Sequence, residues 1–210
     1  RLKFLIAKIG LDEFKNLVEK ERKILPHDHG WTAYLSDINR LEETPLKDAI
    51  SLNGVAKSEA FNEWYATNVY KQRQSGYAVV SVTLPLGDAT ADQFRLMADL
   101  ARKYIKDTIR TTVEQNIVYR WVSEADIPEL YQALQASGLA APGASSIVDV
   151  TACPGTDTCK LGISSSRGLA AELRTQLAEK SASLDEAVKN LRIKISGCFN
   201  SCGQHHVADL

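Results

Sequence analysis

Apolar residues recur at two different spacings in this sequence, and the two spacings predict helices and strands in different places. Residues 11–21, LDEFKNLVEKE, repeat apolar side chains with the helical period, which predicts a helix with a charged outer face. Residues 77–84, YAVVSVTL, are rich in β-branched side chains and are bounded by glycine and proline, which predicts a buried strand. The intervening residues 24–54 have little periodicity and several prolines and glycines, so we interpret them as an irregular connection.

Six elements are predicted between residue 77 and residue 151, in the order strand, helix, strand, strand, helix, strand. They are strands at 77–84, 108–113, 117–122 and 146–151, and helices from Thr90 to near Lys106 and from near Asp126 to Gly138. Thr90 and Gln93 form a candidate capping box, and Gly138 occupies the place of a C-cap glycine. This order predicts an α+β fold of the ferredoxin-like, split βαβ kind.

The last quarter of the chain differs in character. The stretch ACPGTDTCKLGISSSRG, residues 152–168, is a loop of small residues, after which Leu169 to Leu177 begins a predicted helix. LRIKIS, residues 191–196, is a predicted strand that leads into Cys198.

The composition favours a folded chain and argues against a membrane protein or a nucleic-acid-binding protein. The 210 residues are 44% apolar, which is ordinary for a folded chain, and no run of about 18 apolar residues is present. The formal net charge of -1 provides no general attraction for nucleic acid. The first residues do not resemble an export signal, so we expect a cytoplasmic protein with no membrane span. Because the chain starts without methionine, we also expect a fragment of a longer protein.

All four cysteines lie in the last 60 residues, in two pairs. Cys153 and Cys159 form C-x5-C, and Cys198 and Cys202 form C-x3-C. Each pair occupies a glycine-containing loop just after a predicted strand, so two loops at one sheet edge could present four thiolates to one point. An iron–sulfur cluster requires such a set, because thiolate sulfur must replace solvent at each iron.

Other interpretations of the cysteines remain open at this stage. Structural zinc usually takes pairs spaced C-x2-C to C-x4-C, disulfides are expected in exported proteins, and buried thiols can be without function. Two histidine pairs are weaker candidates. His27 and His29 resemble a metal pair only superficially, and His205 and His206 follow the second cysteine loop, where a surface role competes with contact to a cofactor.

The paired motifs TACPGTDTC and SGCFNSCG resemble those of the siroheme-dependent sulfite and nitrite reductase family. The resemblance implies that Cys153, Cys159, Cys198 and Cys202 hold a 4Fe-4S cluster, and that Cys202 also binds the siroheme iron. The second loop departs from the family's frequent CPNGC, because phenylalanine and serine replace its proline and glycine. Both ligand positions are kept, while the loop conformation can differ.

The resemblance also covers upstream segments. NVYKQRQSGYAVVSVTLPLGD resembles the opening of the family's second ferredoxin-like half, and IRTTVEQN resembles a stretch that lines the macrocycle. This implies that Arg110, Gln115 and Asn116 contact siroheme, although a solvated strand arginine is the alternative for Arg110. RLKFLIAKIG resembles the end of the family's first cluster-domain half, which implies catalytic roles for Arg1 and Lys3. We expect these two in an extended stretch that aims both at an oxyanion; the alternative is a solvated charge pair.

The family also implies a domain organisation. Residues 1–50 would end the first siroheme and cluster domain and form a linker, residues 51–145 would be the second ferredoxin-like half-domain, and residues 146–210 would begin an α/β cluster-binding domain that is truncated here.

The implied function is an assimilatory, six-electron reduction of sulfite to sulfide, with ferredoxin or a flavoprotein reductase as electron donor. Nitrite, reduced to ammonia, is the alternative substrate. Two further alternatives are a non-enzymatic module stabilised by zinc on four cysteines, and an inert apo fragment that lacks the first half.

Overall fold

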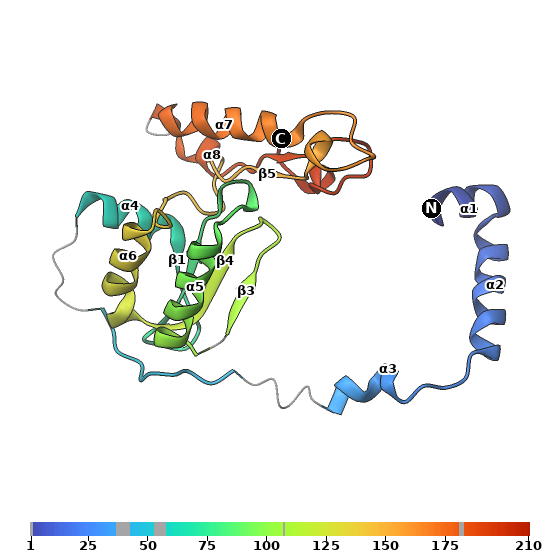
Figure 1. The fold of residues 1–210 in the computed structure, drawn as a ribbon, viewed down its shortest axis with the longest axis horizontal. Helices are drawn as coiled ribbons and strands as arrows, with labels where there is room; N and C mark the ends of the chain where they lie inside the picture. The colour runs from blue at the N-terminus through green and yellow to red at the C-terminus, as the bar shows by residue number, and fades with distance from the viewer. Residues whose placement is uncertain (1, 37–42, 53–57, 107, 181–182) are drawn as a thin grey trace. The chain divides into compact units, whose positions relative to one another are not determined.

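The structure is a computed structural model, and it describes residues 2–36, 43–52, 58–106, 108–180 and 183–210. The chain divides into two compact units, Arg1–Glu43 and Thr44–Leu210, which we describe separately (Figure 1). The first unit contains α1 (Leu2–Ile9), α2 (Leu11–Ile24) and α3 (Gly30–Ala33). Helix α2 confirms the helix predicted from residue 11, and α1 and α2 contact each other.

The prediction of an extended stretch at the start of the chain was wrong for Lys3. This residue lies in α1, and its ammonium is 5.2 Å from the centre of the Phe4 ring. The helix forms because the apolar side chains of LKFLIAKI recur three and four residues apart, which favours a helix over a strand. Arg1 lies outside the described residues, so its predicted position stays untested.

The second unit contains the predicted half-domain followed by the cysteine-bearing segment. Its elements in chain order are α4 (Glu59–Asn68), β1 (Val69–Lys71), β2 (Tyr77–Val82), η2 (Pro85–Gly87), α5 (Ala91–Tyr104), β3 (Ile109–Thr111), β4 (Ile117–Ser123), η3 (Glu124–Asp126), α6 (Ile127–Ala136), β5 (Thr151–Ala152), η4 (Gly155–Asp157), α7 (Ser166–Lys180), α8 (Glu186–Lys189), β6 (Lys194–Ile195) and η6 (His205–Val207).

The half-domain has a four-stranded antiparallel sheet in the order β1-β2-β4-β3. The predicted strand, both helices and the β3–β4 hairpin are confirmed, with Arg110 opposite Val118. Helix α5 begins with the complete capping box of Thr90 and Gln93, and Gly138 after α6 has a φ of 71°, the left-handed conformation that glycine adopts most easily.

The fourth strand of the sheet differs from the prediction. Residues 146–149 form bends and turns, and of the predicted strand only Thr151 is in a strand, β5 (Thr151–Ala152), which pairs in parallel with β6 in a separate sheet. The free edge of β2 is taken instead by β1, which reaches it through a short turn. A short connection costs little loop-closure entropy, so β1 forms this pairing readily. LRIKIS likewise contributes only two strand residues, whereas α7 confirms the predicted last helix and begins three residues earlier.

Among the described residues, buried apolar side chains of the second unit form two groups. The larger one joins β2 and β4 to helices α4, α5 and α6 through fully buried residues such as Trp64, Val80 and Leu130. The smaller one lies under α7, where Ala170 packs with Val150 and Ala152. Among the described helices, none is both long and apolar enough to cross a bilayer.

Buried Asn68 ties α4 to two other parts of the half-domain. Its side-chain nitrogen donates to the carbonyl oxygens of Ser81, at 3.0 Å, and Ala141, at 3.1 Å. Its side-chain oxygen accepts from the Thr67 hydroxyl at 2.7 Å. One amide group therefore joins the end of α4 to strand β2 and to the segment after α6.

Replacing Asn68 with alanine should lower the free energy of unfolding by about 2–4 kcal/mol, because buried carbonyl groups would lose their donors. Urea unfolding followed by circular dichroism measures this change. Asn62→Ala is the matched control, since Asn62 is exposed on the same helix, and should change stability by no more than about 0.5 kcal/mol. Equal effects of the two substitutions would contradict a structural role for the Asn68 amide.

Candidate metal centre

The two cysteine loops leave the same edge of the small parallel sheet. Cys153 directly follows β5, and Cys198 comes three residues after Ile195, the last residue of β6. Parallel strands run in the same direction, so both loops begin side by side. The Cys153 N–H donates to the Ile195 carbonyl at 3.1 Å, and the Cys153 sulfur accepts a hydrogen bond from the Gly197 N–H at 3.1 Å. The predicted meeting of the two loops at one sheet edge is therefore present at Cys153.

Glycine allows the backbones of the two loops to touch. A Cβ atom on Gly197 would lie 2.8 Å from the Gly155 Cα, closer than side chains tolerate. The Gly197 carbonyl accepts from the N–H groups of Ile163, at 2.8 Å, and Ser164, at 3.1 Å. The two loops therefore form one packed structure, in which the sulfur of Cys153 is buried.

The environment of Cys153 favours its thiolate. Burial by itself raises the pKa of this thiol, but hydrogen bonds from the Gly197 N–H, the Ser166 hydroxyl and the Gly155 backbone outweigh it, so the pKa lies below its ordinary value. The thiolate is the form of cysteine that binds metals.

The other three sulfurs are more accessible. Cys198 is half-buried and its sulfur lies 3.2 Å from the Asn200 side-chain nitrogen, while Cys159 and Cys202 are exposed. In the part of the chain that the structure describes, no three His, Cys, Asp or Glu side chains form a group that could hold a metal ion. Four thiols on two adjoining loops fit an iron–sulfur cluster chemically, and binding one would require the loops to draw the exposed sulfurs together.

The residues predicted to contact siroheme lie on the β3–β4 hairpin. Gln115 has a φ of 67°, and its side-chain nitrogen donates to the Ala152 carbonyl at 2.8 Å, next to Cys153. Asn116 is buried and accepts from the Leu84 N–H at 2.9 Å. Arg110 is exposed on edge strand β3. The structure thus brings Gln115 to the cysteine-bearing strand, and the siroheme contacts of all three residues stay predictions.

A buried carboxylate, which the sequence analysis missed, joins this hairpin to α7. Asp149 accepts from the Asn116 side-chain nitrogen at 2.7 Å and from the Ser145 N–H at 2.9 Å. Its second oxygen lies 3.7 Å from the Arg174 guanidinium. Asp149 therefore links three segments that are far apart in the sequence.

Arg167 makes a second link, between α7, the first cysteine loop and the half-domain. Its guanidinium donates to the Leu86 carbonyl at 3.2 Å, forms an ion pair with Asp88, and lies 3.3 Å from the Asp157 carboxylate. Arg167 and Arg174 are seven residues apart, which places them on one helix face. That spacing was the available sequence signal for both residues.

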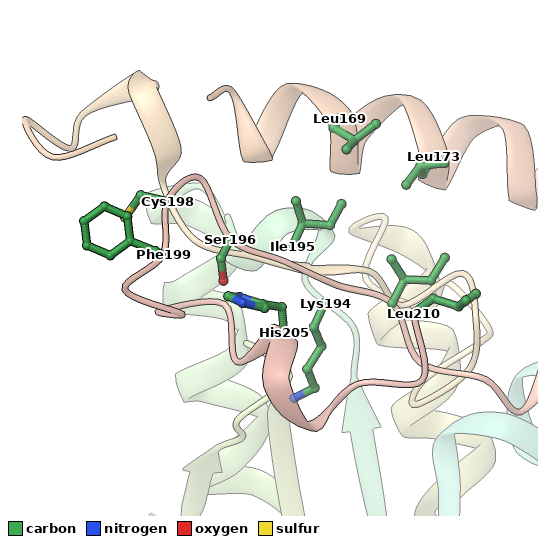
Figure 2. A pocket seen from close by; sticks show the side chains of 10 residues that line it. Leu169, Leu173, Lys194, Ile195, Ser196, Cys198, Phe199, His205 and Leu210 are labelled. Atoms are coloured by element: carbon green, nitrogen blue, oxygen red, sulfur yellow. The ribbon is translucent and has the colours of Figure 1, made fainter. Parts of the chain in front are cut away.

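One histidine pair, His205 and His206, lies in the second unit, and the other, His27 and His29, lies in the first. His205 lines a groove of about 490 Å³, where its ring lies near Ser196 and across from Leu169 and Leu173 of α7 (Figure 2). The ring of His206 is 4.1 Å from that of His205. His27 and His29 have ring centres 4.8 Å apart in the first unit, and the described residues around them do not complete a metal-binding group.

Comparison with known proteins identifies the half-domain. Residues 70–137 match the family described as the nitrite/sulfite reductase ferredoxin-like half domain, and they span most of the four-stranded sheet together with α5 and α6. The chain is a relative of the nitrite and sulfite reductases. This confirms the family that the cysteine motifs indicate.

Relatives of both kinds are similar to the chain over its whole length. It is 28% identical to "Ferredoxin--nitrite reductase, chloroplastic" of Spinacia oleracea over 211 residues, which are 100% of this chain and 31% of that protein. It is also 28% identical to "Sulfite reductase [ferredoxin] 1" of Mycolicibacterium paratuberculosis over 216 residues, which are 100% of this chain and 34% of that protein. The chain thus spans about a third of the length of these relatives.

A solved structure supports the fold. The NirA protein of Mycobacterium tuberculosis superposes with a TM-score of 0.60 at 25% identity, over 97% of this chain and 33% of that protein. The half-domain and the cysteine-bearing segment therefore follow an arrangement that is present in a known relative.

Replacing Asp149 with alanine should lower the free energy of unfolding by roughly 2–4 kcal/mol, because Asn116 and Arg174 would lose a buried partner. Urea unfolding measures this loss. The control is Asp99→Ala, which removes an exposed carboxylate on α5 and should cost less than about 1 kcal/mol. A loss for Asp149→Ala as small as for the control would show that the link does not stabilise the fold.

The pH dependence of this link has a definite sign. Burial raises the pKa of Asp149, although the Ser145 N–H, Asn116 and Arg174 oppose it. The folded chain therefore holds this proton more tightly than the unfolded chain. The stabilisation that the Asp149 proton gives is therefore complete below the ordinary carboxyl pKa of about 3.9. It is lost as the pH rises through the pKa of Asp149 in the folded chain. The stability of the wild type relative to Asp149→Asn should fall with rising pH in this window; a rise, measured by unfolding at several pH values, would contradict the raised pKa.

Proposed function

We propose that this chain is part of a reductase that converts sulfite to sulfide with six electrons. The observation that carries the proposal is the pair of cysteine loops, C-x5-C and C-x3-C, which leave adjoining parallel strands behind a nitrite/sulfite reductase half-domain. Cys153, Cys159, Cys198 and Cys202 would hold a 4Fe-4S cluster, and Cys202 would also bind the siroheme iron. When bound, these groups would store the electrons that the donor supplies and relay them to sulfite, whose three oxygens leave as water.

The protein's own residues would hold these groups and bind the anion. Cys153 has a lowered pKa and a fixed sulfur, which favour its use as a ligand. Arg110, Gln115 and Asn116 would contact siroheme, and Gln115 would also hold the strand that precedes Cys153 through its bond to Ala152. Arg1 and Lys3 would stabilise the bound oxyanion by their positive charge and donate protons to its departing oxygens.

Nitrite is the second candidate substrate. Relatives named as nitrite reductases and as sulfite reductases match at the same 28% identity, so the choice between the two anions depends on experiment. Ferredoxin is the proposed electron donor, because it stands in the names of both relatives, and a flavoprotein reductase is the alternative. We place this reaction in the cytoplasm.

The test uses the complete protein, expressed with iron and siroheme supplied. Purified protein should show siroheme absorption, acid-labile sulfide and more iron than siroheme, and kcat/KM with a reduced viologen dye should be higher for sulfite than for nitrite. Cys153→Ser should abolish the cluster, because a buried hydroxyl is a poor replacement for an iron-bound thiolate. Thr156→Ser, an exposed change in the same loop, is the control and should retain it.

Two results would contradict the proposed metal centre, and a third would contradict the choice of sulfite. A colourless protein that contains zinc would favour the zinc-stabilised module, and a complete protein without iron or zinc would favour an inert chain. A kcat/KM that is higher for nitrite than for sulfite would identify nitrite as the substrate, and the proposed metal centre would be unaffected.

A further inference from the structure

Ser166 lies in contact with the buried cysteine of the metal centre. It is the first residue of α7, and it is 1% exposed. Its hydroxyl oxygen is 3.3 Å from the Cys153 sulfur and 2.8 Å from the Cys153 carbonyl oxygen. The side chain therefore touches the sulfur and the backbone of one proposed ligand.

The direction of the hydrogen bonds at Ser166 depends on whether the Cys153 sulfur carries a proton. A hydroxyl group has one proton and two lone pairs. With Cys153 as a thiol, the S–H can donate to the Ser166 oxygen while the Ser166 O–H donates to the Cys153 carbonyl. With Cys153 as an iron-bound thiolate, the S–H is gone. The Ser166 hydroxyl can then rotate about its C–O bond and donate to the sulfur, without movement of any heavy atom.

The surrounding backbone holds the Ser166 oxygen in this place. A Cβ atom on Gly155 would lie 2.4 Å from it, and one on Gly197 would lie 3.2 Å from it, so both cysteine loops close around the hydroxyl. One helical turn later, Ala170 is fully buried in the apolar group under α7. The helix thus anchors Ser166, and the absence of a side chain on both glycines leaves room for its oxygen.

We propose that Ser166 is a positioning residue for Cys153, and that its hydroxyl donates a hydrogen bond to the ligand sulfur when the cluster is bound. The inference rests on the proposed function. The Gly197 N–H already donates to the same sulfur, so Ser166 supplies a second donor. Hydrogen bonds to a ligand sulfur stabilise the more negative, reduced cluster and raise its reduction potential, and such outer partners also strengthen metal binding.

The experiment compares Ser166→Ala with the wild type and with Ser164→Ala in the complete protein. Ser164 is an exposed serine two residues away, which makes it a matched control. Reduction potentials come from a redox titration followed by electron paramagnetic resonance, and iron retention comes from competition with a chelator. Ser166→Ala should lower the potential and weaken iron retention by about 10- to 100-fold, whereas Ser164→Ala should match the wild type.

A second variant keeps the test decisive. Ser166→Gly removes the hydroxyl and adds no atom to this tightly packed place, so its potential should also lie below that of the wild type, even if Ser166→Ala does not fold. Equal potentials and equal iron retention in the folded Ser166 variants and the wild type would overturn this inference alone. A wild-type protein without any cluster would overturn the proposed function instead.

Discussion

The pairing of two very short parallel strands determines where both cysteine loops begin. Among the described residues, this sheet pairs Thr151 with Lys194 and Ala152 with Ile195 and no others, so the sheet itself contributes few hydrogen bonds. Close contact between the loops compensates for this, because Gly155 and Gly197 allow their backbones to touch. The same contact directs the Gly197 N–H at the Cys153 sulfur, so the geometry of the candidate metal centre depends on this pairing.

The ferredoxin-like half-domain acts as the support for that pairing. Gln115 bonds the backbone of Ala152, Asn116 bonds Asp149, and Arg167 of α7 reaches back to the segment between β2 and α5. These links are hydrogen bonds between partly buried polar groups. Such bonds are directional and are stronger away from water, so they both stabilise and orient the segments that they join. The half-domain thus contributes to the candidate centre through the turn of the β3–β4 hairpin. Its own apolar core lies between the sheet and helices α4, α5 and α6.

Local signals in the sequence were sufficient for much of the fold. The capping box of Thr90, the β3–β4 hairpin and the glycine after α6 are each determined by residues within a few positions of one another. The cysteine spacing, with its family resemblance, identified the candidate centre. The edge position of β1 was missed because it depends on competition between two segments for one sheet edge. Asp149 was missed because its partners Asn116 and Arg174 are far from it in the sequence. The extended placement of Lys3 was wrong because it came from the family resemblance and disregarded the helical period of the apolar residues.

We propose that four cysteines of this chain hold one iron–sulfur cluster. Anomalous diffraction at the iron and zinc absorption edges, from crystals of the complete protein, tests this claim directly. We expect iron, without zinc, in contact with the sulfur atoms of Cys153, Cys159, Cys198 and Cys202. Zinc at these sulfurs, or iron that is remote from Cys153, would contradict it.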